Sequence, residues 1–270
     1  MVFEQLLETS RVKKHPFFIL LLCFFYVLVA YGVAYIFFES MVSVVAIFTL
    51  TLLLVPSLHH LLCSEEKIER KTGVHHFLKN HKDFFKVYGF SFLGVVLGLL
   101  VVNFMLPADL FSYQNDFLVK HHSLSRMQEF GQRPYAPGFP DVVSLFSFNL
   151  EVALVCFILS LFYGAGAVFL VVFNASLFAT FFLFITKNIG SALVSTVLFL
   201  QFLPEILGFL LAAVAGAILS AAIVRENRQS SYFKNVLKNT VIMFLIAIAL
   251  IFFAALIEIF VSASLIHSFI

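Results

Sequence analysis

Seven long apolar segments alternate with short polar ones along the chain. The apolar runs lie near 16–38, 41–62, 84–106, 144–163, 167–186, 191–223 and 239–266. Each run holds about the 20 residues that a helix needs to cross a hydrocarbon core roughly 30 Å thick. The pattern therefore predicts an all-α fold, a polytopic membrane bundle of about seven transmembrane helices that forms one domain over residues 1–270.

The sixth apolar run is too long for one simple crossing. Residues 189–224 form a stretch of 36 positions without Lys, Arg or Asp, and a straight helix of that length would measure about 54 Å. Pro204 and Glu205 stand in its middle. Proline removes a helical hydrogen bond, and an isolated carboxylate at membrane depth costs a few kcal/mol. We expect a single crossing whose helix is interrupted at Pro204-Glu205.

The polar stretches predict the connections. Residues 1–15 resemble a short interfacial segment with one apolar side, 63–83 a cytoplasmic loop, and 107–143 a large outer loop with a turn-rich Pro and Gly segment. The short link Gly164-Ala165-Gly166 has two interpretations. It is either a tight reversal between two spans or a break within a hairpin that does not fully cross.

The basic residues orient the chain. If seven spans begin with a cytoplasmic N-terminus, the inner segments hold 13 Lys and Arg residues and the outer segments 4. Because Lys and Arg accumulate on the cytoplasmic side, we expect a multi-pass protein of the cell membrane with its C-terminus outside.

The composition and the missing motifs exclude several classes of protein. Hydrophobic residues make up 61% of the chain and charged residues 12%, which excludes an ordinary soluble domain. No phosphate-binding loop or serine-hydrolase elbow is present, and the histidines near Cys63 lack the spacing of a zinc site. The residue spacing within 65–70 and 77–81 matches a pattern of intramembrane proteases. Both segments lie in a charged inner loop, however, and not in apolar helices, where the water-activating glutamate of such a protease would have to lie. We expect no enzyme activity, cofactor, bound metal or nucleic acid partner.

Polar residues inside the spans are the candidate intramembrane site. They are Glu205, Asn174, Asn149, Glu151 and Glu258. One interpretation is structural, because amides and carboxylates join helices by hydrogen bonds. The other is an outward-open polar cavity in which Glu205 binds a proton, a cation or a ligand.

Small residues predict close helix packing. Ala212, Gly216 and Ser220 are spaced four residues apart, as are Gly94 and Gly98. Such spacing lets helix backbones approach one another. We expect these residues to pack helices of the same chain against one another. The same pattern is also compatible with a homo-oligomer.

Two central motifs carry a family resemblance. Residues 162–169, with a Gly-Ala-Gly-Ala core, precede Asn174-Ala175-Ser176, and residues 203–206 lead into the Ala-rich stretch 213–220. Together they resemble the signatures of stage II sporulation protein M-like membrane proteins, most closely the archaeal branch. The family usually has His-Gly where this chain has Gln201-Phe202.

The resemblance implies an integral membrane protein, and the bacterial namesake of the family is a membrane anchor or scaffold that works with cell-wall-remodelling proteins. The sequence thus supports two functional hypotheses. The first is a non-enzymatic anchor or scaffold subunit that contacts membrane lipids and a membrane or envelope protein. The second is a transporter or channel component that uses the region of Asn174 and Glu205, because broken helices form transporter sites.

Overall fold

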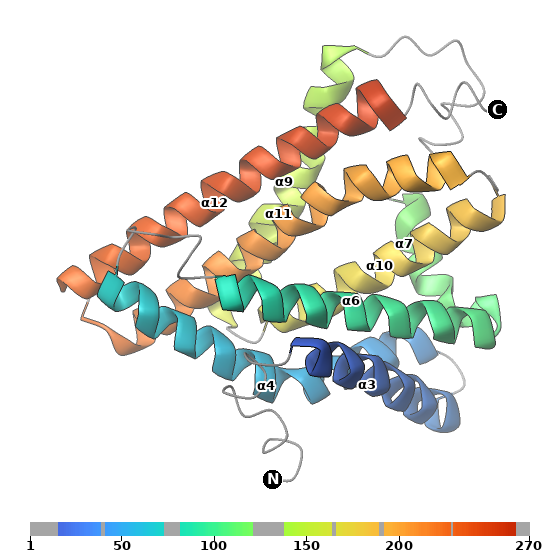
Figure 1. The fold of residues 1–270 in the computed structure, drawn as a ribbon, viewed down its shortest axis with the longest axis horizontal. Coiled ribbons are helices and arrows are strands. Elements are labelled where there is room, and N and C mark those ends of the chain that lie inside the picture. Colours follow the sequence, from blue (N-terminus) through green and yellow to red (C-terminus); the bar gives the residue numbers. More distant parts are fainter. Residues whose placement is uncertain are drawn as a thin grey trace.

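A computed structural model describes residues 16–38, 41–72, 82–120, 138–163, 166–188, 192–227 and 229–262. Its regular elements over these residues are all helical (Figure 1). The seven long helices are α3 (Pro16–Phe37), α4 (Val42–Thr72), α6 (Lys82–Met105), α9 (Phe139–Phe162), α10 (Gly166–Asn188), α11 (Ala192–Arg225) and α12 (Ser231–Ile257). The shorter helices are η1 (Ala108–Phe111), α7 (Ser112–Lys120) and η2 (Glu258–Ser262), the last a π-helix.

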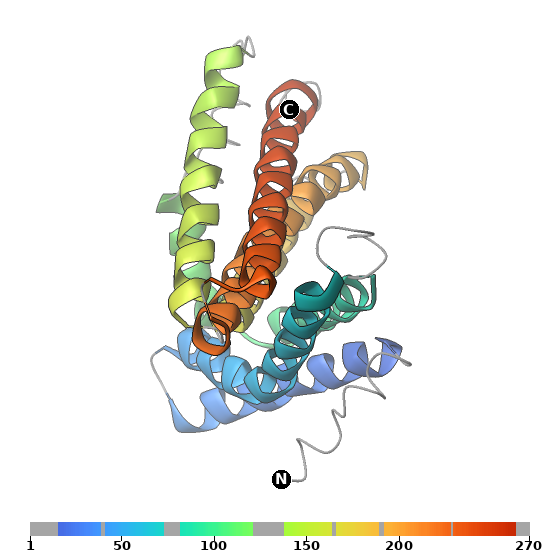
Figure 2. The same ribbon diagram turned by 90° about the vertical axis from the view of Figure 1, so that its left-hand side faces the viewer.

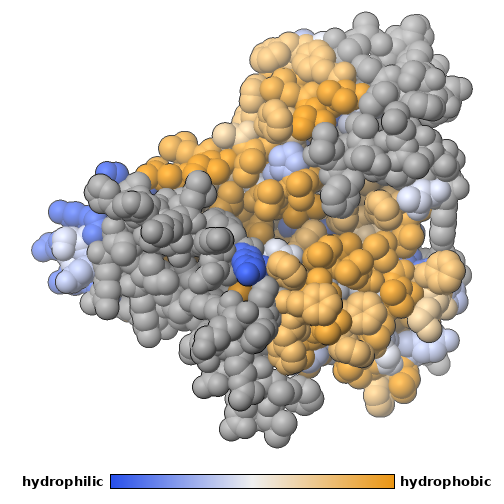
Figure 3. Space-filling view, viewed as in Figure 1, coloured by the Kyte–Doolittle hydropathy of each residue, from blue (hydrophilic) through white to orange (hydrophobic). Residues whose placement is uncertain are grey.

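The long helices confirm a helical membrane bundle. Over the described residues, five helices are long and apolar enough to cross a membrane, and α4 and α10 contain shorter apolar stretches, Val42–Pro56 and Val168–Phe184. Exposed Phe, Leu, Val and Ile side chains cover much of the outside, and the face in Figure 3 is largely hydrophobic. Lipid tails solvate such a surface, whereas water would not.

Successive long helices run in alternating directions. In Figure 1 the C-terminal ends of α4 and α11 and the N-terminal end of α12 lie at the left of the molecule, and α6 runs away from that side toward the right. Hydrophilic residues gather at the same end of the face in Figure 3. The arrangement fits a chain that crosses back and forth between two polar regions.

Helix α11 is the central helix. It is the most buried of the five spanning helices and α9 the least, and it packs against α9, α10, α12 and α4. In Figure 2, α9 and α12 stand side by side, whereas α3 and α4 lie across the base of the molecule. The C-terminal half of α11 is rich in alanine and contains Gly216, and small residues let neighbouring helices pack closely around it.

The sequence predicts that α11 is interrupted at Pro204-Glu205, but the structure has a continuous, curved helix there (Figure 1). The helix continues from Ala192 to Arg225 with Pro204 inside it, and Figure 1 shows its axis curving. A proline removes one hydrogen bond and displaces the carbonyl four residues earlier, which a bend can accommodate. Pro204 is buried among neighbouring helices, so packing maintains the helix through the weak point.

Several helices extend beyond the apolar runs that predict them. Helix α4 continues into the predicted cytoplasmic segment 63–83 as far as Thr72. Helix α12 begins at Ser231 rather than 239, because the Ser230 hydroxyl accepts a hydrogen bond from the Phe233 N–H at 3.1 Å and caps the helix. The outer loop expected at 107–143 contains η1, α7 and the first turn of α9. The segment 1–15 lies outside the described residues.

The small residues pack inside the chain, as predicted. A Cβ on Gly94 would contact the Leu20 carbonyl oxygen of α3, and one on Gly98 would lie 2.8 Å from Val27 Cβ. A Cβ on Gly216 would contact the Phe157 carbonyl oxygen of α9. These contacts bring α6 against α3 and α11 against α9. The second contact positions two of the helices that line the site described next.

Candidate intramembrane binding site

A cavity of about 480 Å³ lies between α7, α9, α10 and α11. Its wall combines apolar side chains with four polar ones, Glu151, Cys156, Asn174 and Glu205. A volume of this size falls in the range of small-molecule pockets, which are mostly apolar with a few convergent polar groups.

Three of the five predicted site residues meet at this cavity. Glu205 projects from α11, Asn174 from α10 and Glu151 from α9. The Asn174 side chain also lies within hydrogen-bonding reach of the Cys156 thiol on α9. Residues far apart in the sequence thus form one polar region, which the packing of α9 and α10 on α11 produces.

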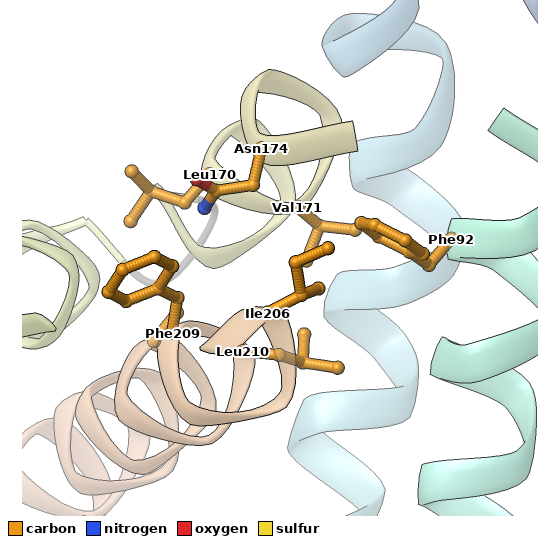
Figure 4. A pocket seen from close by; sticks show the side chains of 8 residues that line it. Phe92, Leu170, Val171, Asn174, Ile206, Phe209 and Leu210 are labelled. Carbon is orange, nitrogen blue, oxygen red and sulfur yellow. The ribbon is translucent and has the colours of Figure 1, made fainter. Parts of the chain in front are cut away.

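A second, much smaller cavity adjoins the first. It has a volume of about 10 Å³ and shares Leu170, Asn174, Ile206 and Phe209 with the large cavity, which is about the room that one water molecule needs. In Figure 4 the Asn174 amide points into the space between α10 and α11, toward the side where Phe209 lies. Asn174 therefore stands where the two spaces adjoin.

Aromatic rings form most of the apolar wall. Eight of the 19 described lining residues are phenylalanines. Phe202 makes edge contacts with Phe181 and Phe178 at centroid distances of 4.6 and 5.8 Å, and Phe117 of α7 makes one with Phe173 at 5.3 Å. Edge-to-face contacts fix the orientation of the rings, so the wall has a defined shape. Helix α7 covers one side of the cavity.

The cavity reaches the surface along α9. Its lining residues Glu151, Val155 and Leu159 are all exposed. Toward the N-terminal end of α9, Asp141, Ser144 and Ser147 are exposed as well. Their spacing places them on the same side of the helix as Glu151. A polar path therefore leads from the end of α9 to the carboxylate at the cavity wall.

The remaining predicted residues lie elsewhere. Asn149 is buried on the face of α9 that also carries Ala153 and Cys156, without lining the cavity. Glu258 ends α12, where its N–H donates to the carbonyls of Ala254 and Ala255. Both positions fit structural roles at helix contacts and ends.

The Gly-Ala-Gly link separates two helices. Helix α9 ends at Phe162 and α10 begins at Gly166, whose N–H donates to the Tyr163 carbonyl at 2.6 Å. The helices hold 24 and 23 residues, each long enough for about 30 Å. Two separate helices of this length favour the reversal over the incomplete hairpin. Gly164 itself lies outside the described residues.

Sequence reasoning missed the contributions of α7 and of the serines on α9. A signal for α7 exists, because Phe111, Gln114, Phe117 and Leu118 recur at helical spacing. The polar positions of α9, three or four residues apart in an apolar span, are a similar signal. The cavity volume has no signal in the sequence, since it depends on how four helices pack.

Within the described part of the chain, no three residues among His, Cys, Asp and Glu gather closely enough to hold a metal ion. The side chains of Cys63 and of the neighbouring histidines are not among those that the structure describes.

Comparison with known proteins gives one finding. Residues 87–263 match the family model described as stage II sporulation protein M. No curated protein and no solved structure matches the chain. The matched region begins in α6 and extends past η2, so it includes every helix that lines the cavity, whereas α3 and α4 precede it.

Proposed function

Because the chain belongs to the stage II sporulation protein M family, we propose that its family region builds a solute-binding site inside the cell membrane. In this proposal the protein is a non-enzymatic transporter or channel component, and Glu205 and Asn174 recognise the solute. The observation that carries the proposal is the cavity of about 480 Å³, in whose wall both residues lie.

Energetics favour a binding role for this arrangement. A carboxylate in the hydrocarbon region is costly, so it persists where it faces protein or a water-filled space. Glu205 contributes to a wall that also holds Asn174 and the exposed Glu151. A carboxylate whose only role was to join helices would not need a space of this size beside it.

Water access to the cavity tests the proposal. Val155 and Leu154 are neighbours on α9 and both are exposed, but only Val155 lines the cavity. Single cysteines at these positions, in a protein whose three native cysteines are replaced by alanine, are treated with a membrane-impermeant maleimide. Thiols react as thiolates, which form in water, so we expect Val155→Cys to react at least about tenfold faster than Leu154→Cys.

The side of entry follows from the proposed topology. The maleimide should reach Val155→Cys in intact cells, because the polar path on α9 starts at the outer end of that helix. Equal, slow labelling of both cysteines would show that lipid or protein fills the space, and the proposal would be abandoned.

The family match also motivates a second candidate, the anchor or scaffold role implied for the bacterial namesake. Such a role needs a stable protein partner in the membrane or envelope. Purification in a mild detergent from native membranes, followed by quantitative mass spectrometry, should then recover one partner at a constant ratio to the chain. A preparation without a reproducible partner argues against it.

A further inference from the structure

We propose that the ligand of the cavity is an amphipathic organic cation, a molecule with a positive charge and an apolar or aromatic body. This inference rests on the proposed function, since it names the ligand class of the same cavity. It follows from three properties of the wall, namely its charge, its rings and its shape.

The ionisable side chains among the described lining residues of the cavity, the Cys156 thiol aside, are all acidic. Among its 19 described lining residues are the carboxylates of Glu151 and Glu205, and none is Lys, Arg or His. In surroundings with a low effective dielectric constant, a charge pair interacts several times more strongly than in water. An anion in the cavity would face two carboxylates and no basic side chain of this wall, whereas a cation would be attracted to both carboxylates.

The rings favour the same sign. Aromatic faces carry negative electrostatic potential, and they attract cations within about 6 Å of the ring centroid, most strongly when the cation is desolvated. Phe173 and Phe178 lie on α10 on either side of Asn174, and Phe202 and Phe209 lie on α11 on either side of Glu205; all four line the cavity. The polar residues are thus flanked along their helices by rings that suit a weakly hydrated organic cation.

The size and the apolar character of the cavity argue against a bare divalent metal ion as its ligand. A cavity of about 480 Å³ is far larger than an ion needs, and Mg²⁺ or Ca²⁺ would require six or more oxygen ligands. Most of this wall is hydrocarbon, which an organic body can cover.

The test compares two ions of nearly the same shape and opposite charge. Radiolabelled tetraphenylphosphonium and tetraphenylborate are offered to the purified full-length protein in mild detergent by equilibrium dialysis. We expect saturable binding of the phosphonium and none of the borate. Glu205→Gln should weaken phosphonium binding by about tenfold or more, whereas Glu258→Gln, the same change outside the cavity, should leave the affinity within about twofold.

A second measurement avoids changing the carboxylate. Tetraphenylphosphonium should slow the maleimide reaction of Val155→Cys, and tetraphenylborate should not. Equal binding of the two ions, or equal affinities of the Glu205→Gln and Glu258→Gln proteins, overturns the cation assignment. If Val155→Cys is labelled but the phosphonium neither binds nor protects, the cation assignment is overturned while the hydrated site stands. If Val155→Cys is not labelled at all, the proposed function itself fails.

Discussion

Single glycines decide how closely the helices of this protein approach. A Cβ on Gly94 would meet the backbone of α3 at Leu20, whereas a Cβ on Gly89, five residues earlier on α6, would have no atom within 4 Å. The sequence shows both as glycines in one apolar helix. Only the packing of α3 on α6 separates a required glycine from a replaceable one.

Alanine at these two positions should therefore act in opposite directions. Gly94→Ala places its methyl group against the α3 backbone, and we expect a loss of roughly 1–3 kcal/mol from overpacking. Gly89→Ala meets open space and improves helix propensity, so we expect a gain of up to about 1 kcal/mol. Thermal unfolding of both purified variants in the same detergent measures the difference. Equal shifts for the two variants would contradict the observed α3–α6 contact.

At the scale of a helix, Pro204 connects the shape of α11 to the cavity. Phe202, Glu205, Ile206 and Phe209 line the cavity, and at 100° per residue they cluster on the face roughly opposite Pro204. A proline ring pushes away the preceding turn on its own side, so the helix is convex there and concave on the opposite face. The curvature should thus make room for the cavity.

Replacing the proline tests this connection. Pro204→Ala restores the missing hydrogen bond and should straighten α11, which narrows the cavity and slows maleimide labelling of Val155→Cys by roughly tenfold. Pro56→Ala is the matched control, because Pro56 also lies inside a long helix, α4, but is exposed and does not line the cavity. A labelling rate that is the same in both variants would remove the role given to Pro204.

The elements also show what the sequence can and cannot predict. The spans follow from apolar length, because a helix in lipid must satisfy its own backbone, and all seven long helices lie where the pattern predicts them. The ends are harder to predict, since the start of α12 depends on a local hydrogen bond to the Ser230 side chain. Glu205 and Asn174 stand out in the sequence as polar residues in apolar spans, but their meeting with Glu151 depends on tertiary packing.

For the whole molecule, the alternation of the helices limits the topology to two orientations. The described helices alternate between two ends (Figure 1), so fixing the side of one connection fixes all the others. The 13 basic residues assigned to inner segments, against 4 in outer segments, favour a cytoplasmic N-terminus. The opposite orientation would place the open end of the polar α9 path inside the cell.

Two exposed tyrosines distinguish these orientations. Tyr113 lies on α7 and Tyr232 at the start of α12, at 48% and 46% exposure, so accessibility alone predicts similar reactivity for cysteines placed there. In intact cells we expect an impermeant maleimide to label Tyr113→Cys, and to label Tyr232→Cys only after the membrane is opened. The reverse result would invert the topology. Because α7 also covers the cavity, the reverse result would mean that the proposed cation site opens toward the cytoplasm rather than toward the outside.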